Sequence, residues 1–322
     1  MKAMTVKDGT LVLTDVEKPA PQRGEVLIRV CAIGVNRADL LQRNGTYPSP
    51  KGWPAWPGLE VAGTVEETGG EAGGFRIGDN VCALLGGGGY AEYVCAPRGL
   101  VMPMPKGLSY AQAAVLPEAF ATSYLNLFWE GHLQAGQTVF IPAGASGLAS
   151  VAIPMAKAFG ARVITSVLSD EIAGKIEPLG ADLVVNTARE DVSAVLKREE
   201  ESGYPVNLSM DCLSGAMLGK SLPYMAEGGY WVVISTLAGA ETTVSLRPLL
   251  TKGLHLVGSM LRKRSNEEKA ALLTELVEKV WPKLERGELR THICRALPLE
   301  AASAALAILE RGENVGKVVL TV

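Results

Sequence analysis

From Gln137 onward, short apolar runs alternate with segments of helical spacing, and this alternation limits the fold more than any other feature. The runs are TVFIPAG, ARVITSV, DLVVN, NLSMDC, GYWVVIS and LHLVGSM. Strands that are almost continuously apolar and are separated by helices are typical of a parallel sheet that is covered on both faces. We therefore predict an α/β fold of the Rossmann type, a doubly wound parallel sheet.

A turn of small residues follows the first of these runs. Val139–Ile141 is followed by Ala-Gly-Ala-Ser-Gly-Leu-Ala at 143–149. Small residues let a backbone approach a pyrophosphate closely, and the helix that follows offers unpaired N–H groups and a positive dipole end. The turn departs from the G-x-G-x-x-G spacing, so by itself it fits a close strand–helix contact equally well. Its place at the head of the alternating series favours dinucleotide binding.

The end of the next apolar run bears on the choice of cofactor. Ser166 and Ser169 offer hydroxyl groups where an NAD enzyme usually holds a carboxylate to the ribose. Asp170 comes later and is expected to begin the next helix. The missing acid favours NADPH, with NADH left open.

The uncharged stretch from Val139 to Ala156 is about long enough to cross a bilayer. It contains Pro142 and Pro154 and is rich in Gly, Ala and Ser, so a strand, a turn and a buried helix explain it better. We predict no membrane segment.

The residues before Gln137 have a different pattern. Short β-branched runs separated by Gly and Pro predict a twisted β-rich domain, and from about Tyr110 the spacing becomes helical, with Ser109 as a cap. After a predicted helix at Glu267–Arg286, a further helix and a closing strand are expected to return to the first domain. A chain of 322 residues is too long for one ordinary core, so we expect two domains.

Charge and cysteine usage exclude several classes of protein. The formal net charge is −3 and there is no basic block, so we expect no nucleic-acid partner. The five cysteines are scattered without a CxxC pair, which argues against a disulfide framework and a structural zinc site. The first residues carry charges and no apolar core, so we expect no secretory signal and a cytoplasmic protein.

Several segments, spread in order over the chain, resemble one family. They include Asn36-Arg37-Ala38-Asp39-Leu40, Pro57-Gly58-Leu59-Glu60-Val61-Ala62-Gly63, Gly89-Tyr90-Ala91-Glu92-Tyr93-Val94, Leu116-Pro117-Glu118, Leu261-Arg262-Lys263-Arg264 and Gly316-Lys317-Val318-Val319. The pattern resembles the quinone oxidoreductase branch of the medium-chain dehydrogenase/reductases, and within it the zinc-free, NADPH-using tumour-suppressor-inducible subgroup.

The resemblance implies a GroES-like substrate domain at 1–120 and 287–322, and a Rossmann dinucleotide-binding domain at 121–286. It also implies a homodimer, and a cleft that holds nicotinamide and a small-molecule substrate. Zinc-dependent relatives have Cys at position 36 and His at position 59, where this chain has Asn36 and Leu59. Since a catalytic zinc needs three protein ligands and only Glu60 of that set remains, we expect no metal. Glu60 is then expected to be a buried hydrogen-bonding residue.

The resemblance also implies roles for individual residues. Tyr47 would polarise the substrate oxygen through a phenolic hydrogen bond, and Asn36 would contact the nicotinamide carboxamide or the ribose. The alternatives are that Tyr47 is a loop aromatic that fills the domain interface, and that Asn36 is a turn residue that bonds its own backbone. Of the basic pair Arg262 and Arg264, Arg264 is the preferred cofactor contact. The full cofactor-binding set is Asn36, Thr122, Gly144, Ser146, Gly147, Leu148, Ser166, Ser169, Leu237, Leu261, Arg264 and Asn314. His132, His255 and His292 match no catalytic position and are expected to be structural.

The chain departs from the family in the nucleotide pocket. Ala149 replaces the third glycine of the turn, and Pro154 is expected to bend the first helix. Ile172 replaces a lysine that pairs with the 2′-phosphate, and Thr187 replaces a tyrosine that assists it. NADPH use, weak binding and relaxed cofactor preference therefore all stay open.

We expect a zinc-independent reductase that transfers hydride from NADPH to a quinone or an α,β-unsaturated carbonyl. An enoyl thioester reductase of a specific pathway is the second hypothesis. The third is a catalytically silent cofactor-binding or structural protein with the same fold.

Overall fold

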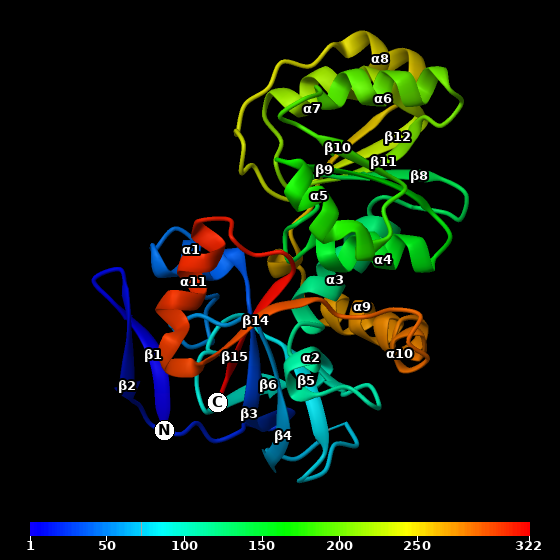
Figure 1. The fold of residues 1–322 in the computed structure, drawn as a ribbon. Helices are drawn as coiled ribbons and strands as arrows, with labels where there is room; N and C mark the ends of the chain where they lie inside the picture. The colour runs from blue at the N-terminus through cyan, green and yellow to red at the C-terminus, as the bar shows by residue number, and fades with distance from the viewer. Residues whose placement is uncertain (72) are drawn as a thin grey trace. The chain divides into compact units, whose positions relative to one another are not determined.

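The computed structural model describes residues 1–71 and 73–322. The chain forms two compact units. Unit 1 comprises Met1–Ala121 and Arg262–Val322, and unit 2 comprises Thr122–Leu261. Figure 1 shows that both ends of the chain belong to unit 1.

Unit 2 is a six-stranded parallel sheet in the order β10-β9-β8-β11-β12-β13. Its strands are β8 (Thr138–Ile141), β9 (Arg162–Val167), β10 (Leu183–Asn186), β11 (Val206–Asp211), β12 (Met225–Val233) and β13 (His255–Gly258). Its helices are α4 (Ala149–Ala158), α5 (Asp170–Ile176), α6 (Val192–Glu201), α7 (Ala216–Ser221) and α8 (Leu246–Lys252). In Figure 1, α4 and α5 cover one face of the sheet, and α6 and α7 cover the other. The strand order and the two helical layers confirm the predicted doubly wound Rossmann fold.

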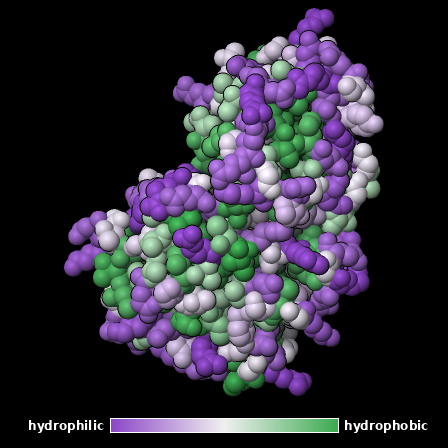
Figure 2. All heavy atoms as spheres, in the orientation of Figure 1, coloured by the Kyte–Doolittle hydropathy of each residue, from purple (hydrophilic) through white to green (hydrophobic). Residues whose placement is uncertain are grey.

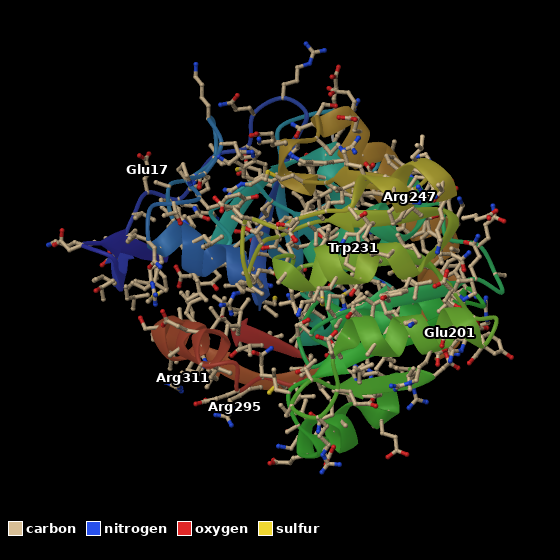
Figure 3. The ribbon with its side chains drawn as sticks, turned by 90° about the horizontal axis from the view of Figure 1, so that it is seen from above. Glu17, Glu201, Trp231, Arg247, Arg295 and Arg311 are labelled. Carbon is tan, nitrogen blue, oxygen red and sulfur yellow. The ribbon has the colours of Figure 1, made fainter. Side chains whose placement is uncertain are left out.

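The centre of unit 2 is held by a buried polar contact as well as by apolar packing. Trp231 on β12 is fully buried, and its indole N–H donates to the Asp211 carboxylate on β11 at 2.8 Å. The same carboxylate accepts from the backbone N–H groups of Leu213 and Ser214. Figure 3 shows Trp231 inside the unit, whereas Glu201 and Arg247 lie at its edge. The end of β11 is therefore fixed from three directions.

Unit 1 is built on a seven-stranded sheet in the order β14-β15-β3-β4-β5-β7, with β6 also paired to β3, and on a β1-β2 hairpin. The strands are β1 (Lys2–Lys7), β2 (Thr10–Asp15), β3 (Glu25–Val35), β4 (Glu60–Thr68), β5 (Asn80–Leu84), β6 (Tyr93–Pro97), β7 (Val101–Pro103), β14 (Ile293–Pro298) and β15 (Lys317–Thr321). The helices are α1 (Arg37–Arg43), α2 (Tyr110–Ala113), α9 (Asn266–Lys279), α10 (Trp281–Glu285) and α11 (Ala302–Glu310), and α3 (Pro117–Tyr124) begins in unit 1. As expected, the closing strand returns to the first domain: β15 pairs with β3 antiparallel.

Two details of the sequence prediction differ from the structure. The helical stretch after Ser109 divides into α2 and α3, although Ser109 does cap α2 by accepting from Gln112 N. The predicted helix at Glu267–Arg286 divides at Val280 into α9 and α10.

The domain boundary predicted at residue 287 also differs, because residues 262–286 group with unit 1. The Trp281 indole donates to Pro103 O at 2.8 Å, and Glu285 accepts from Lys106 N at 3.0 Å. These contacts attach α10 to the β-rich unit, although its sequence continues the helix–strand alternation of the Rossmann sheet.

The uncharged stretch at 139–156 forms β8, the small-residue turn and most of α4. Across residues 1–71 and 73–322, none of the helices combines the length and the apolar character that a bilayer span requires. Hydrophilic and hydrophobic residues are interspersed on the face drawn in Figure 2.

Candidate active site

Asn36 and Asp39 form the first turn of α1, where β3 ends. Asn36 is the N-cap, and its backbone N–H donates to Asp39 Oδ2 at 2.8 Å. The fully buried Asp39 carboxylate also accepts from Gly58 N at 3.2 Å and from the Tyr90 hydroxyl at 3.0 Å. Burial raises the pKa of Asp39 to about 6, and these hydrogen bonds oppose the rise. Asp39 therefore fixes the turn that carries Asn36.

A buried lysine connects Asn36 to Glu60. Lys317 Nζ lies 2.7 Å from Glu60 Oε1, 2.7 Å from Asn36 Oδ1 and 3.1 Å from Val35 O. Both charged side chains are almost completely buried, with exposed fractions of 3% for Lys317 and 0% for Glu60. Asn36 Nδ2 donates to Glu60 Oε1 at 3.0 Å. The Asn36 amide thus has a fixed orientation, with its oxygen taken by the ammonium.

Gly34 makes room for this arrangement. A Cβ at this position would lie 2.2 Å from Glu60 Oε1 and 2.6 Å from Ala114 O. Any side chain would displace the carboxylate, so β3 needs glycine opposite Glu60.

A second carboxyl group stands beside Glu60. The backbone N–H of Glu118, in the first turn of α3, donates to Glu60 Oε2 at 2.8 Å. Burial and then the neighbouring Glu60 charge raise the pKa of Glu118 to about 8, and the charges of Lys317 and Arg262 act in the opposite direction. The raised pKa favours the protonated form of the Glu118 carboxyl group at neutral pH.

Tyr47 is held by Arg262. The Arg262 guanidinium carbon lies 4.0 Å from the centroid of the Tyr47 ring, and Nη1 donates to Tyr47 O at 3.2 Å. Its Nη2 donates to Gly86 O at 2.6 Å. Burial raises the pKa of the Tyr47 phenol and the Arg262 charge opposes this, so the phenol stays a proton donor over the neutral range. The ring has a fixed place and an adjacent positive charge.

The small-residue turn of unit 2 fits a pyrophosphate. Across residues 1–71 and 73–322, no oxygen accepts from the N–H groups of Ala145, Gly147 and Leu148, which precede α4 and are half-buried. Gly144 N donates to Ser166 O at 2.8 Å, and a Cβ on Gly144 would lie 2.5 Å from Thr165 Oγ1. The turn thus combines close packing on β9 with unused donors at a helix N-terminus, as a phosphate requires.

The turn also has a strained residue. Ala143 has φ = 56°, a left-handed conformation. Glycine adopts it freely and Asn and Asp adopt it at times, but alanine adopts it rarely. The turn therefore has a left-handed residue at position 143 although alanine, and not glycine, occupies that position.

The two hydroxyl groups predicted at the end of β9, those of Ser166 and Ser169, both have local partners. Ser166 Oγ accepts from Ala143 N at 3.4 Å, and Ser169 Oγ caps α5 by accepting from Ile172 N at 3.3 Å. Thr187 Oγ1 donates to Val167 O at 3.0 Å. Ile172 is half-buried in the first turn of α5. As expected, Asp170 begins α5.

The other predicted cofactor residues are distributed over both units. In unit 2, Thr122 O accepts from Asn126 Nδ2, Leu237 is 46% exposed, and Leu261 is buried. In unit 1, Arg264 forms an ion pair with Glu268 at 3.0 Å, and Asn314 Nδ2 donates to Gly316 O at 2.9 Å. Of the basic pair, Arg262 contacts Tyr47, and the role of Arg264 as a cofactor contact stays a prediction.

Within the described ranges, 1–71 and 73–322, no three His, Cys, Asp or Glu side chains are grouped as metal ligands. All five cysteines are free thiols.

Three residues of the unit 1 site were not singled out from the sequence: Lys317, Glu118 and Asp39. Each lay inside a segment that carried the family resemblance. A usable signal for Lys317 is its position within the apolar run VGKVVLTV, where a strand would bury it. Nothing in the sequence marks Glu118 as the neighbour of Glu60.

Comparison with known proteins agrees with this two-unit architecture. Residues 22–106 match the alcohol dehydrogenase GroES-like domain, and residues 147–278 match the zinc-binding dehydrogenase family. These matches place the chain among the medium-chain dehydrogenase/reductases.

Individual relatives are more specific. The chain is 31% identical to the quinone oxidoreductase of Sus scrofa, over 95% of this chain and 92% of that protein. It is 31% identical to a quinone oxidoreductase-like protein 2 homolog of Nematostella vectensis, over 92% of this chain and 81% of that protein. The solved quinone oxidoreductase of Thermus thermophilus has a TM-score of 0.83 and 32% identity, and the similarity covers 100% of both chains. The chain belongs to the quinone oxidoreductase branch, and it is an oxidoreductase of that type.

Proposed function

We propose that the protein is a zinc-independent reductase that uses NADPH to reduce a quinone or an α,β-unsaturated carbonyl compound. The observation that carries this proposal is the small-residue turn, whose three unused N–H groups precede α4 at the head of a Rossmann sheet. The Thermus thermophilus relative was solved in complex with NADPH, and the pig relative is a quinone oxidoreductase, which supports the same cofactor and substrate class here.

The residues have separable tasks in this mechanism. When bound, NADPH would supply a hydride. The turn at 143–149 would hold the pyrophosphate through Ala145, Gly147 and Leu148 N–H, with Ser166 and Ser169 on the ribose side. Tyr47 donates a hydrogen bond, and then its proton, to the substrate oxygen as negative charge develops there. Arg262 fixes the Tyr47 ring and stabilises the resulting phenolate electrostatically.

Asn36 has a smaller role in this proposal than the sequence predicted. Its oxygen accepts from Lys317, and its amide nitrogen donates to Glu60. The second N–H of the amide makes only a long contact with Gly34 O, at 3.4 Å. A nicotinamide or a substrate oxygen would replace that contact, so Asn36 would orient the ligand and exchange no proton.

We extend the proposal to a cytoplasmic homodimer. In the described part of unit 2, β13 is a terminal strand that pairs only with β12, and Leu256 on it is 47% exposed. An apolar sheet edge of this kind favours pairing with a second copy. Light scattering on the purified protein is expected to give the mass of two chains.

The decisive experiment measures binding and turnover separately. Calorimetry with NADPH and then NADH tests the nucleotide site, and cofactor oxidation with a panel of quinones, enones and enoyl thioesters tests the chemistry. We expect NADPH binding and turnover with quinones or enones. Turnover only with enoyl thioesters would favour the pathway-specific reductase, and binding without turnover would favour the catalytically silent protein.

A further inference from the structure

The proposed function leaves one part of NADPH without a charged partner, the 2′-phosphate of the adenosine ribose. The family resemblance implies that relatives hold this phosphate with a lysine and a tyrosine, at the positions of Ile172 and Thr187. Here Ile172 is half-buried and apolar, and the Thr187 hydroxyl donates to Val167 O at 3.0 Å. If the protein uses NADPH, another cation has to meet the phosphate.

The place for this cation is the end of β9, the second strand of the Rossmann series along the chain. In such folds the adenosine ribose lies at the end of the second strand, and in NADP enzymes a nearby arginine accommodates the 2′-phosphate. The strands β9 and β10 end side by side, because Val167 pairs with Asn186 and the Thr187 N–H donates to Val167 O at 2.8 Å. The residues that follow β10 are therefore held against the expected ribose site.

Arg189 is the cation that the chain brings to this strand end. Its backbone N–H donates to Asn186 O at 3.0 Å, in the turn after β10. The Asn186 amide donates to Asp170 Oδ1 at 2.6 Å, and the Arg189 guanidinium forms an ion pair with the same carboxylate. In unit 2, which the structure describes throughout residues 122–261, no other lysine or arginine forms an ion pair with residues 166–170. The guanidinium is thus held at the residue that follows Ser169, on the ribose side of the proposed nucleotide site.

The ion pair with Asp170 can be exchanged for a phosphate at little cost. The side chains of Arg189 and Asp170 are 70% and 53% exposed, and an exposed ion pair adds little to stability. Asp170 keeps the Asn186 amide as a partner when the guanidinium leaves. A phosphate monoester carries more negative charge than a carboxylate and accepts from both N–H groups of a guanidinium fork. The new contact is therefore stronger than the ion pair that it replaces.

We propose that Arg189 binds the 2′-phosphate of NADPH and that Asp170 competes with the phosphate for it. The inference rests on the proposed function, because it names the residue that distinguishes NADPH from NADH. Arg189 takes over the task of the lysine that Ile172 replaces, and acts from the loop after β10 instead of the first turn of α5. The Asp170 carboxylate lowers the gain, because it holds the guanidinium in the free protein and repels the phosphate in the complex. The preference for NADPH over NADH is therefore modest.

Calorimetry with two pairs of nucleotides tests the inference without any turnover. The pairs are NADPH with NADH, and the fragments 2′,5′-ADP with 5′-AMP, and the members of each pair differ only in the 2′-phosphate. Arg189→Ala should weaken the binding of NADPH and 2′,5′-ADP by about fivefold, the order of a partly exposed charge-assisted contact, and leave NADH and 5′-AMP unchanged. Arg189→Lys should lie between Arg189→Ala and the native protein, because it keeps the charge but not the fork. The loss should shrink as salt is added.

Arg198→Ala is the matched control. Arg198, on α6, is also an exposed arginine of unit 2, and it forms an ion pair with Glu190 at 2.9 Å with 57% of its side chain exposed. The control should bind all the nucleotides as the native protein does. The inference is overturned if Arg189→Ala loses no affinity for NADPH and 2′,5′-ADP, if it loses as much for NADH, or if Arg198→Ala loses as much.

Asp170→Asn tests the competition. The substitution keeps an oxygen for the Asn186 amide but removes the charge that holds Arg189. The binding of NADPH and 2′,5′-ADP should become about two- to fivefold tighter, and the double variant Asp170→Asn/Arg189→Ala should lose most of this gain. A gain of the same size with and without Arg189 would contradict the competition. Both side chains are exposed, so these variants are expected to fold.

Failure of this inference and failure of the proposed function give different results. If the native protein and Arg189→Ala bind NADPH equally well, Arg189 is not at the phosphate and the reductase proposal stands. If neither NADPH nor NADH binds the native protein, the proposed function fails and the inference fails with it. Binding of 2′,5′-ADP that depends on Arg189, together with no turnover of any quinone, enone or enoyl thioester, would support the phosphate site and overturn the reductase.

Discussion

Replacing Lys317 by Met should destabilise unit 1 strongly. The substitution keeps the length and most of the volume of the side chain but removes the ammonium that bonds Glu60, Asn36 and Val35 O. Glu60 is fully buried and would be left as an uncompensated negative charge with only the Asn36 and Glu118 N–H donors. Removal of one member of a buried ion pair costs about 3–5 kcal/mol.

The expected loss of stability is large because the Lys317–Glu60 pair is buried. An exposed lysine–glutamate pair contributes roughly 0–1 kcal/mol, because water screens it and replaces the lost bond. Lys18 and Glu66 form such a pair at 2.8 Å, with 41% and 35% of the side chains exposed, and belong to the same unit. Lys18→Met is therefore a matched control that removes the same chemical group from the surface.

Urea unfolding, followed by fluorescence and circular dichroism, measures how much Lys317→Met and Lys18→Met each change the free energy of unfolding. We expect a loss of about 4 kcal/mol for Lys317→Met, or a melting temperature lower by roughly 8–16 °C. The double variant Glu60→Gln/Lys317→Met should recover much of the loss, because residue 60 then carries no charge that the missing ammonium would have to balance. Equal, small losses for Lys317→Met and Lys18→Met would refute the reasoning, as would a double variant no more stable than Lys317→Met.

Three further outcomes are expected. Tyr47→Phe should lower turnover by about 1–3 kcal/mol, or roughly 5- to 150-fold, while the Kd for NADPH is unchanged; native turnover with quinones and enones alike would make Tyr47 a packing residue. Ile172→Lys should tighten NADPH binding by about 1 kcal/mol through the 2′-phosphate, less so in high salt, and leave NADH unaffected. Equal gains for both cofactors, or a lower melting temperature without any gain, would mean that position 172 is not at the phosphate. Elemental analysis of the purified protein should find no stoichiometric zinc, and about one zinc per chain with activity lost on chelation would contradict this.

The parts of the fold that local patterns determine were predictable. Apolar runs separated by helical spacing gave the Rossmann sheet, and the small residues at 143–149 located its turn, because both features depend on neighbours along the chain. The helices α9 and α10 were assigned to the other domain since their attachment is non-local: Trp281 bonds to Pro103 O, far earlier in the sequence.

The candidate site was predictable only in part for the same reason. Asn36 and Tyr47 belong to segments with a family pattern, and the structure places both in unit 1 with fixed orientations. The contact of Arg262 with the Tyr47 ring depends on how a short 3-10 turn (Leu261–Lys263) directs the side chain, and sequence spacing does not determine that. The role of Arg264 as a cofactor contact stays a prediction. Lys317 meets Glu60 across a separation of 257 residues, so no local pattern could pair them.

The pairing of Lys317 with Glu60 also gives a physical reason for the expected independence from zinc. The family resemblance implies that zinc-dependent relatives place ligands at positions 36 and 59, next to the acidic residue at position 60. In this chain β15 pairs with β3 and brings an ammonium to 2.7 Å from both Asn36 Oδ1 and Glu60 Oε1. That positive charge is covalently attached, buried and already hydrogen-bonded, so it neutralises Glu60 without an exchangeable ion. A zinc ion would have to displace the ammonium and would find an amide and a leucine where two strong ligands are needed.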